Sequence, residues 1–192
     1  MLTLIQEGSS VENNITANKV RSAFGGESQA YQRYKVWGRK AEDEGYPNVA
    51  RLFYGIAYAE EVHAGNHFEV LGDVKGDFLV ASMAGFGLGD TKENLEGAKE
   101  GEDFEIHEMY PAYLRVAEMQ NEKGAIRSFK WALEAEKAHS ELFQRAIDSV
   151  SNGNDIDIDE VSVCGKCGYT TTEGVPDYCP ICGAPRNRFK SY

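Results

Sequence analysis

Apolar residues recur every three or four positions along four long stretches of the chain, which is the spacing of one face of an α-helix. Gly45 and Gly72 suit the position just after a helix, Pro47 suits a first turn, and Asp90 with Glu93 resembles a capping box. We therefore expect helices over about residues 14–44, 47–71, 91–123 and 124–150. The pattern predicts an all-α four-helix bundle.

The predicted inward faces carry acidic residues where apolar ones are expected. Glu27 lies on the face of the first segment, and Glu-x-x-His motifs at residues 60–63 and 136–139 lie on the second and fourth. Each motif places two ligands side by side, because residues three apart are neighbours on a helix. The inward face of the third segment is expected to comprise Ala98, Glu105, Glu108, Ala112, Val116 and Met119.

An internal repeat relates two halves of this region. Residues 41–63 align with residues 117–139 at a constant offset of 76, which pairs the two Glu-x-x-His motifs. Glu27 and Glu105 are 78 residues apart, so a small slip precedes the aligned block. A duplicated helix pair, with its halves related by a pseudo-twofold axis, would produce this repeat.

The acidic residues together indicate a pair of metal ions. One Glu from each of two helices and Glu-x-x-His from each of the other two is the ligand pattern of carboxylate di-iron bundles. Five carboxylates carry −5, which the +4 of two Fe²⁺ nearly cancels, whereas unpaired buried carboxylates are costly. Oxygen-rich ligands favour Fe or Mn over tetrahedral Zn. The candidate ligands are Glu27, Glu60, His63, Glu105, Glu108, Glu136 and His139.

Simpler explanations apply to other residues. A single Glu on an apolar face often caps a helix or extends into solvent. Here the two Glu-x-x-His motifs occupy equivalent positions of the internal repeat, with carboxylates on the other two helices, which favours the metal site. His67 is expected to pack in the core or behind a ligand, and His107 to face solvent. Tyr34 suits a hydrogen bond to a ligand and core packing equally. Trp37 and Trp131 are expected to serve packing.

Composition excludes several classes of protein. With 20 basic and 31 acidic residues, the formal charge of −11 argues against an extended nucleic-acid-binding face. The hydrophobic content of 42% supports a folded core. No apolar run reaches the roughly 18 residues of a membrane helix. The first residues, 1–5, are too short and lack the basic charge of a signal peptide, so we expect a cytoplasmic protein.

The cysteines form a second candidate site. Cys164, Cys167, Cys179 and Cys182 are the four cysteines of the chain and make two C-x-x-C pairs. In a cytoplasmic protein this spacing indicates a tetrahedral Fe or Zn site rather than disulfides. Residues 162–192 are too few to bury a large hydrophobic core. A bound metal would therefore supply much of the folding energy of this segment. A redox-capable bundle favours Fe, and a structural zinc ribbon is the alternative.

Changes in composition divide the chain into three parts. We expect the bundle over residues 1–150, an acidic linker over residues 151–161 and a metal-binding domain over residues 162–192. The glycine-rich stretch at residues 85–89 reads G-x-G-x-G and follows no predicted strand. It therefore does not indicate a dinucleotide-binding domain.

These motifs, in this order, resemble the rubrerythrin family over about residues 14–190. The motifs are Gly26-Glu-Ser-Gln-Ala30, Glu60-x-x-His63, Glu105-x-x-Glu108-Met-Tyr-Pro111, Glu136-x-x-His139 and the two cysteine pairs, read as C-x-x-C-G-Y and C-P-x-C-G. The resemblance implies a ferritin-like four-helix bundle with a non-haem di-iron centre. It also implies a C-terminal rubredoxin-like domain with one iron bound by four cysteines.

The resemblance further implies a role for each ligand. Glu60 and Glu136 would bridge the two irons. Glu27 would be a terminal ligand of one iron, and Glu105 and His139 would be terminal ligands of the other.

The remaining two ligands would exchange with each other. The resemblance implies that Glu108 and His63 alternate on the first iron as its oxidation state changes. It also implies a homodimer or larger homo-oligomer, with the rubredoxin-like centre of one subunit near the di-iron site of the other.

The function that the resemblance implies is a peroxidase of oxidative stress protection, which reduces hydrogen peroxide to water. Electrons would come from a rubredoxin or an NAD(P)H-dependent reductase, because the sequence offers no nicotinamide or flavin site. An iron-oxidising, iron-storing protein of the ferritin type is the alternative. A non-catalytic electron carrier or scaffold with zinc at the cysteines is a third interpretation, and Mn in the bundle and dioxygen as oxidant stay open.

Overall fold

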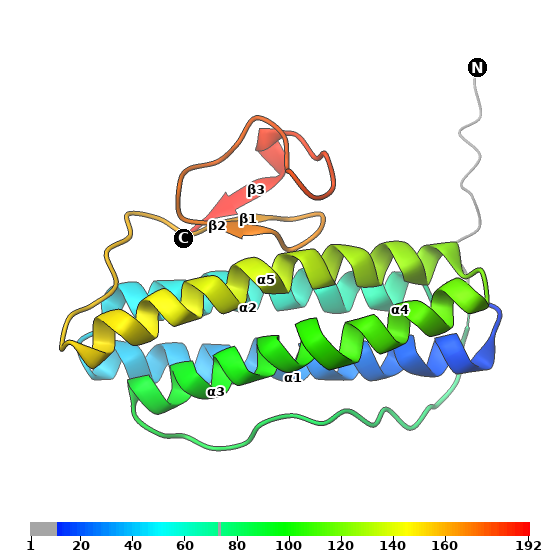
Figure 1. Ribbon diagram of the computed structural model, residues 1–192, viewed down its shortest axis with the longest axis horizontal. Helices are drawn as coiled ribbons and strands as arrows, with labels where there is room; N and C mark the ends of the chain where they lie inside the picture. The colour runs from blue at the N-terminus through cyan, green and yellow to red at the C-terminus, as the bar shows by residue number, and fades with distance from the viewer. Residues whose placement is uncertain (1–10, 73) are drawn as a thin grey trace.

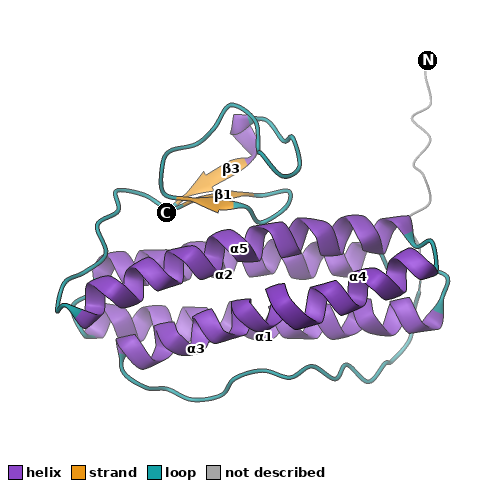
Figure 2. Ribbon diagram, in the orientation of Figure 1, coloured by secondary structure: helices purple, strands orange, loops and turns teal. Residues whose placement is uncertain are grey.

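The computed structural model describes residues 11–72 and 74–192, so the expectation for residues 1–5 lies outside the described part of the chain. The helices pack side by side as a four-rod bundle, in which α3, η1 and α4 follow one another along a single rod (Figures 1 and 2). Their bounds are α1 Asn14–Asp43, α2 Pro47–Glu69, α3 Thr91–Phe104, the π-helical turn η1 Glu105–Met109, α4 Tyr110–Met119 and α5 Lys123–Ser151.

The helix ends follow the signals in the sequence, with one exception. Asp90 and Glu93 form the expected capping box, with a hydrogen bond of 2.8 Å from Glu93 N to Asp90 Oδ1. The break before α5 was expected at Gly124 but lies at residues 120–122. Asn121 reverses the chain there with φ of 56°, and the Glu122 carboxylate accepts a hydrogen bond from Asn13 N at the start of α1.

The π-helical turn η1 overturns the predicted inward face of the third rod. A π turn holds one more residue than an α turn and therefore rotates every later residue around the helix axis. Glu102 is buried before the turn, and Met109 and Leu114 are buried after it. The prediction that Glu108 points inward is wrong, because Glu108 is exposed, and Met119 is 76% exposed for the same reason.

Two apolar clusters fill the ends of the bundle. One contains the aromatic group of Tyr34, Trp37, Phe53 and Phe143, with ring centroids 5.4–6.1 Å apart. The other is built around Tyr110 and Phe129. Because the acidic residues fall between these clusters along α1, α2 and α5, the carboxylates occupy the middle of the bundle.

A small three-stranded sheet follows the bundle and sits on α2 and α5 (Figure 1). Its strands are antiparallel in the order β2-β1-β3. Their bounds are β1 Ser162–Cys164, β2 Thr170–Thr171 and β3 Phe189–Ser191, and the 3₁₀ turn η2 Arg186–Arg188 precedes β3.

The segment between α5 and β1 is packed against the bundle. Asp155 caps α2 by accepting hydrogen bonds from Asn48 N (2.7 Å) and Val49 N (3.0 Å), and Ile156 and Ile158 are buried. These contacts fix where the sheet begins, so the segment holds the cysteine domain in place.

The long α2–α3 connection runs along the opposite side of the bundle (Figure 2). Two hydrogen bonds fasten it to α1, from Ser22 Oγ to Ala81 O (2.9 Å) and from Trp37 Nε1 to Gly87 O (3.0 Å). None of the helices that the structure describes has the length and apolar character needed to cross a membrane.

Candidate metal centres

The middle of the bundle brings together two groups of four ligand residues. Within each group, one ligand atom per residue lies within 4.8 Å of the others. Glu60 and Glu136 belong to both groups, so the groups lie side by side. Glu27 and His63 complete the first group, and Glu102 and His139 complete the second.

One of these residues was not predicted from the sequence. Five predicted ligands are buried in the two groups, Glu102 takes a place that was not predicted, and Glu105 is half-buried beside them. Glu108 lies outside, as described above. The internal repeat carried the signal, because Glu102 is 102 − 27 = 75 residues after Glu27 and so fits the offset of 76 better than Glu105 does.

Glu27 and Glu102 each belong to only one of the two groups, and each of these unshared carboxylates accepts a hydrogen bond from a tyrosine. Tyr34 Oη donates a hydrogen bond of 2.7 Å to Glu102 Oε1, so Tyr34 contacts a candidate ligand as well as the aromatic cluster. On the other side, Tyr110 Oη donates a hydrogen bond to Glu27 Oε1. Both tyrosines are fully buried, so each fixes the orientation of its carboxylate.

Behind Tyr110 a hydrogen-bonded chain continues through His67. His67 Nε2 lies 2.9 Å from Tyr110 Oη, and His67 Nδ1 lies 2.8 Å from Ser128 Oγ. Because the Tyr110 proton goes to the Glu27 carboxylate, His67 donates from Nε2 and accepts at Nδ1 from Ser128. Burial lowers the pKa of His67, which agrees with a neutral ring. His67 therefore acts behind a ligand, one of the two expectations for it.

The two motif histidines face the carboxylates with Nδ1 and the cysteine domain with Nε2. His63 Nε2 lies 3.1 Å from Cys167 O, and His139 Nε2 lies 2.9 Å from Thr170 Oγ1. The carbonyl oxygen only accepts, and the Thr170 hydroxyl already donates to Gly168 O, so both Nε2 atoms donate. Such partners fix the ring and leave Nδ1 as the atom directed at a metal.

Gly168 makes this contact possible. Its φ is +83°, and a Cβ atom at this position would overlap the His63 imidazole. Only glycine adopts this conformation readily and leaves space for the ring. The C-x-x-C-G sequence therefore seats the cysteine domain on the bundle in addition to forming the cysteine turn.

Burial and mutual repulsion dominate the electrostatics of the centre. Burial, together with the neighbouring carboxylates, raises the pKa values of Glu60, Glu102 and Glu105 well above their usual range. Burial alone would lower the pKa of His63, but Glu136 and Glu60 raise it well above the usual value. Glu136 is the exception, because the two histidines outweigh burial and lower its pKa. Without cations, the centre must therefore retain protons.

The centre also contains buried oxygen atoms without partners. Glu27 Oε2, Glu60 Oε1, Glu105 Oε2 and Glu136 Oε1 accept no hydrogen bond among the described residues, although His63 Nδ1 lies 2.8 Å from Glu136 Oε1. Buried carboxylate oxygens are normally paired, so four together require another ligand. Cations surrounded by carboxylate oxygens and two imidazoles meet this requirement, and the residues therefore fit a pair of metal ions such as Fe or Mn.

The four cysteines form a separate centre. The Sγ atoms of Cys164 and Cys182 are 3.7 Å apart, and those of Cys167 and Cys179 are 3.5 Å apart. Metal–sulfur bonds of about 2.3 Å at tetrahedral angles place sulfur atoms roughly 3.8 Å apart. Hydrogen bonds from Cys164 and Cys167 lower the pKa of the Cys179 thiol, which favours a thiolate there. The cluster fits one tetrahedral metal ion.

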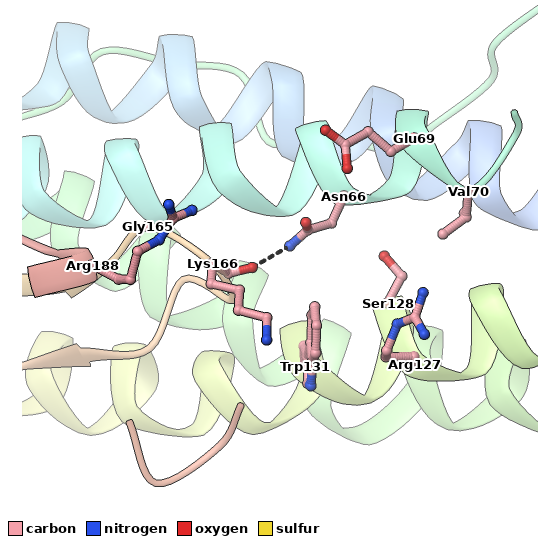
Figure 3. Close-up of a pocket in the computed structure, with 9 residues that line it drawn as sticks. All are labelled: Asn66, Glu69, Val70, Arg127, Ser128, Trp131, Gly165, Lys166 and Arg188. Carbon is pink, nitrogen blue, oxygen red and sulfur yellow. Dashed lines mark hydrogen bonds between the residues drawn. The ribbon is translucent and has the colours of Figure 1, made fainter. Parts of the chain in front are cut away.

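A pocket of about 520 Å³ lies beside this centre, between α2, α5 and the cysteine domain (Figure 3). Its walls carry three cations, Arg127 of α5 with Lys166 and Arg188 of the cysteine domain, together with Glu69. Arg127 and Lys166 lie 5.8 and 5.3 Å from the ring centroid of Trp131. None of the three cations pairs with a carboxylate in the described ranges, so the pocket is locally basic in an acidic protein.

Comparisons with known proteins agree with this arrangement. The family model described as rubrerythrin matches residues 18–147, and the model of the rubrerythrin rubredoxin-like domain matches residues 163–190. Rubrerythrin-2 of Clostridium acetobutylicum is 49% identical over 183 residues, covering 95% of this chain and 100% of that protein. Nigerythrin of Nitratidesulfovibrio vulgaris is 29% identical, covering 96% of this chain and 87% of the relative.

A solved structure agrees as well. Nigerythrin in a fully reduced, all-ferrous state superposes with a TM-score of 0.82 at 27% identity, covering 98% of this chain and 91% of that one. The match extends over the ferritin-like bundle and the cysteine domain together. The chain has a carboxylate centre in its bundle and a four-cysteine centre in the domain that packs on α2 and α5. It belongs to the rubrerythrin family.

Proposed function

We propose that this protein is a non-haem di-iron peroxidase that reduces hydrogen peroxide to water. The observation that carries the proposal is the pair of ligand groups that share Glu60 and Glu136 beneath a docked four-cysteine centre. When bound, two ferrous ions supply one electron each, which meets the two electrons in H₂O₂ + 2 e⁻ + 2 H⁺ → 2 H₂O, and the two protons come from the solvent.

The residues in each of the two bundle groups indicate which side chains would bind each ion. Glu60 and Glu136 would contact both ions, because both groups include them. Tyr34 and Tyr110 would keep the unshared carboxylates in place, and the Nε2 hydrogen bonds of the histidines would direct Nδ1 inward. The first ion would be held by Glu27 and His63, and the second by Glu102 and His139.

We assign the exchanging carboxylate to Glu105 rather than Glu108. Glu105 begins the π-helical turn, and its Oε2 is buried without a partner. Burial, together with the nearby carboxylates of Glu27 and Glu136, raises the pKa of Glu105, so it lies close to both groups. Glu108 is exposed and has no such contact. Glu105 and His63 would thus alternate, while Glu102 takes the terminal position first expected for Glu105.

The four-cysteine centre would return electrons to the bundle, and iron is the metal that suits this role. The Cys167 carbonyl already accepts the hydrogen bond from His63 Nε2, so a bonded path connects the two centres. Both partners of this contact belong to one chain, whereas the resemblance had implied a contact between subunits. A homo-oligomer remains part of the proposal.

The donor to the four-cysteine centre would be external, a rubredoxin or an NAD(P)H-dependent reductase. The basic pocket beside the Cys164–Cys167 turn supports an acidic carrier, because unpaired cations on a protein of charge −11 steer acidic partners to that position. Four free thiols at a metal site suit a reducing compartment, so we place the reaction in the cytoplasm.

The proposal is tested by reducing the iron-loaded protein anaerobically and adding one equivalent of hydrogen peroxide. We expect oxidation of the bundle iron within seconds, followed by that of the four-cysteine iron, as its visible absorption reports. The Glu60→Ala variant should lose turnover but keep the absorption of the cysteine centre. A reduced bundle that survives the peroxide for minutes would refute the peroxidase. Uptake of many irons per chain would indicate storage instead.

A further inference from the structure

A second cavity opens to the surface on the side away from the cysteine domain and reaches Glu105, beside the carboxylate centre. Its volume is about 580 Å³, and Glu105 lines it from η1. The α2–α3 connection forms the outer wall through residues 82–86, and α1 and α3 form the inner wall. Because Glu105 is adjacent to the centre, this cavity offers a path from the solvent to the proposed reaction site.

The outer wall is held in place at both ends. The hydrogen bonds to Ala81 O and Gly87 O fasten the connection on either side of residues 82–86. At Gly25 and Gly26 the connection lies so close to α1 that a Cβ atom would be 2.6 Å from Val80 Cγ1 and 3.0 Å from Ser82 Oγ, respectively. The two glycines before Glu27 thus allow the connection to pack directly beside the centre.

The cavity is lined by apolar side chains together with a few charged ones, among them the exposed Glu100. Met83 and Phe86 are 87% and 93% exposed, and Phe104 also contributes to the wall. Two of its polar lining residues contain buried atoms without a partner among the described residues, the acceptor Glu105 Oε2 and the donor Arg33 Nε. Small-molecule sites share this composition, an apolar wall with a few polar groups.

The size of the cavity exceeds what hydrogen peroxide needs. Two oxygen atoms occupy roughly 60 Å³, about twice the share of one water molecule, so the cavity has room for a larger molecule in place of the water that would otherwise fill it. Glycines at residues 97 and 101 leave part of the inner wall without side chains. An apolar tail on the peroxide would fill this space and bury Met83 and Phe86.

We propose that this cavity admits organic hydroperoxides and that the protein reduces them as alternative substrates. The hydroperoxide group would donate its hydrogen bond to Glu105 and accept one from Arg33, while the alkyl or aryl tail would lie along Met83 and Phe86. The inference rests on the proposed peroxidase function, because the same centre supplies the electrons.

The reaction balances as ROOH + 2 e⁻ + 2 H⁺ → ROH + H₂O. The O–O bond breaks, the oxygen distal to the tail leaves as water, and the oxygen attached to carbon remains in the alcohol. The two electrons come from the same external carrier as in the reduction of hydrogen peroxide. No further co-reactant is required.

The test compares two glycine variants with cumene hydroperoxide and hydrogen peroxide as substrates. Gly97→Leu fills the cavity, and its Cβ meets only ordinary contact with Trp37, at 3.5 Å. Gly65→Leu is the matched control, because Gly65 is an exposed helical glycine with open space around it. Gly97→Leu should lower kcat/KM for cumene hydroperoxide by about tenfold or more, mainly through KM, and that for hydrogen peroxide by less than about threefold.

A second pair of variants tests the apolar wall. Phe86→Ser should weaken the selectivity for cumene hydroperoxide, whereas Leu79→Ser should not, although both side chains are 93% exposed and lie on the same connection. Binding is measured separately from turnover, by ligand-observed NMR of cumyl alcohol with the redox-inert zinc-loaded protein. The alcohol should bind the wild type and Gly65→Leu but not Gly97→Leu.

The outcomes separate this inference from the proposed function. If the wild type reduces hydrogen peroxide but not cumene hydroperoxide, or if Gly97→Leu lowers both rates equally, the cavity does not admit organic hydroperoxides. The inference fails in the same way if another copy of the chain covers residues 82–86 and excludes cumyl alcohol. If the wild type reduces neither peroxide, the peroxidase function itself is wrong.

Discussion

Replacing Tyr34 with Phe removes one hydroxyl from the carboxylate centre and leaves the ring in the aromatic cluster. The hydroxyl donates a hydrogen bond of 2.7 Å to Glu102 Oε1, and both residues are buried. A hydrogen bond to a buried charged group contributes about 1.5–3 kcal/mol. If this energy serves to hold Glu102 ready for a metal, Tyr34→Phe should weaken the affinity for one ion by roughly 10- to 150-fold.

The affinity is measured by anaerobic calorimetric titration with ferrous ions, in protein whose four-cysteine site is already filled. The ion held by Glu27 and His63 should keep its affinity, and the ion held by Glu102 and His139 should bind more weakly. Tyr110→Phe should show the opposite pattern, because Tyr110 holds Glu27.

The control variant is Tyr54→Phe, which removes a similar hydrogen bond, from Tyr54 Oη to Glu42 Oε2 at 3.0 Å, on the exposed surface. It should bind both ions as the wild type does. If Tyr34→Phe also binds both ions with unchanged affinity, Glu102 is not a ligand, and the assignment of Glu105 to the exchanging position loses its support.

Three further predictions follow from the same geometry. Glu102→Ala should lose one bundle ion, whereas Glu108→Ala should keep both. Metal analysis of the two purified variants checks this, and equal losses of metal would contradict the register shift at η1. Gly168→Ala should separate the cysteine domain from the bundle, because its Cβ overlaps His63, and the four-cysteine iron should then stay reduced when peroxide oxidises the bundle. Metal-free protein should become less stable as the pH rises from about 5 to about 8, because groups with raised pKa values hold protons in the folded state that the unfolded chain releases. Thermal unfolding of metal-free protein at each pH checks this, and a melting temperature that rises with pH would contradict it.

The spacing of residues along the chain was enough to predict the fold and most of the carboxylate centre. The three- and four-residue spacing of apolar positions predicts the helices, and the structure confirms the bundle and the capping box at Asp90. The Glu-x-x-His motifs lie where their helical spacing placed them, because α2 and α5 are regular through both motifs. The two cysteine pairs likewise meet in one cluster, since each C-x-x-C turn is local.

Packing between elements set the features that the local pattern did not predict. The π-helical turn at Glu105 shifts the register of the residues after it by one, and no spacing rule in the sequence marks it, so Glu108 leaves the inward face. Glu102 lies before this turn, one helical turn after the buried Ala98, and enters the centre. The contact of the cysteine domain with His63 depends on residues 104 positions apart in the chain. The cavity beneath the α2–α3 connection likewise depends on how that connection packs on α1. Periodicity describes one element at a time, whereas register shifts and contacts between elements are decided by packing that only the folded chain contains.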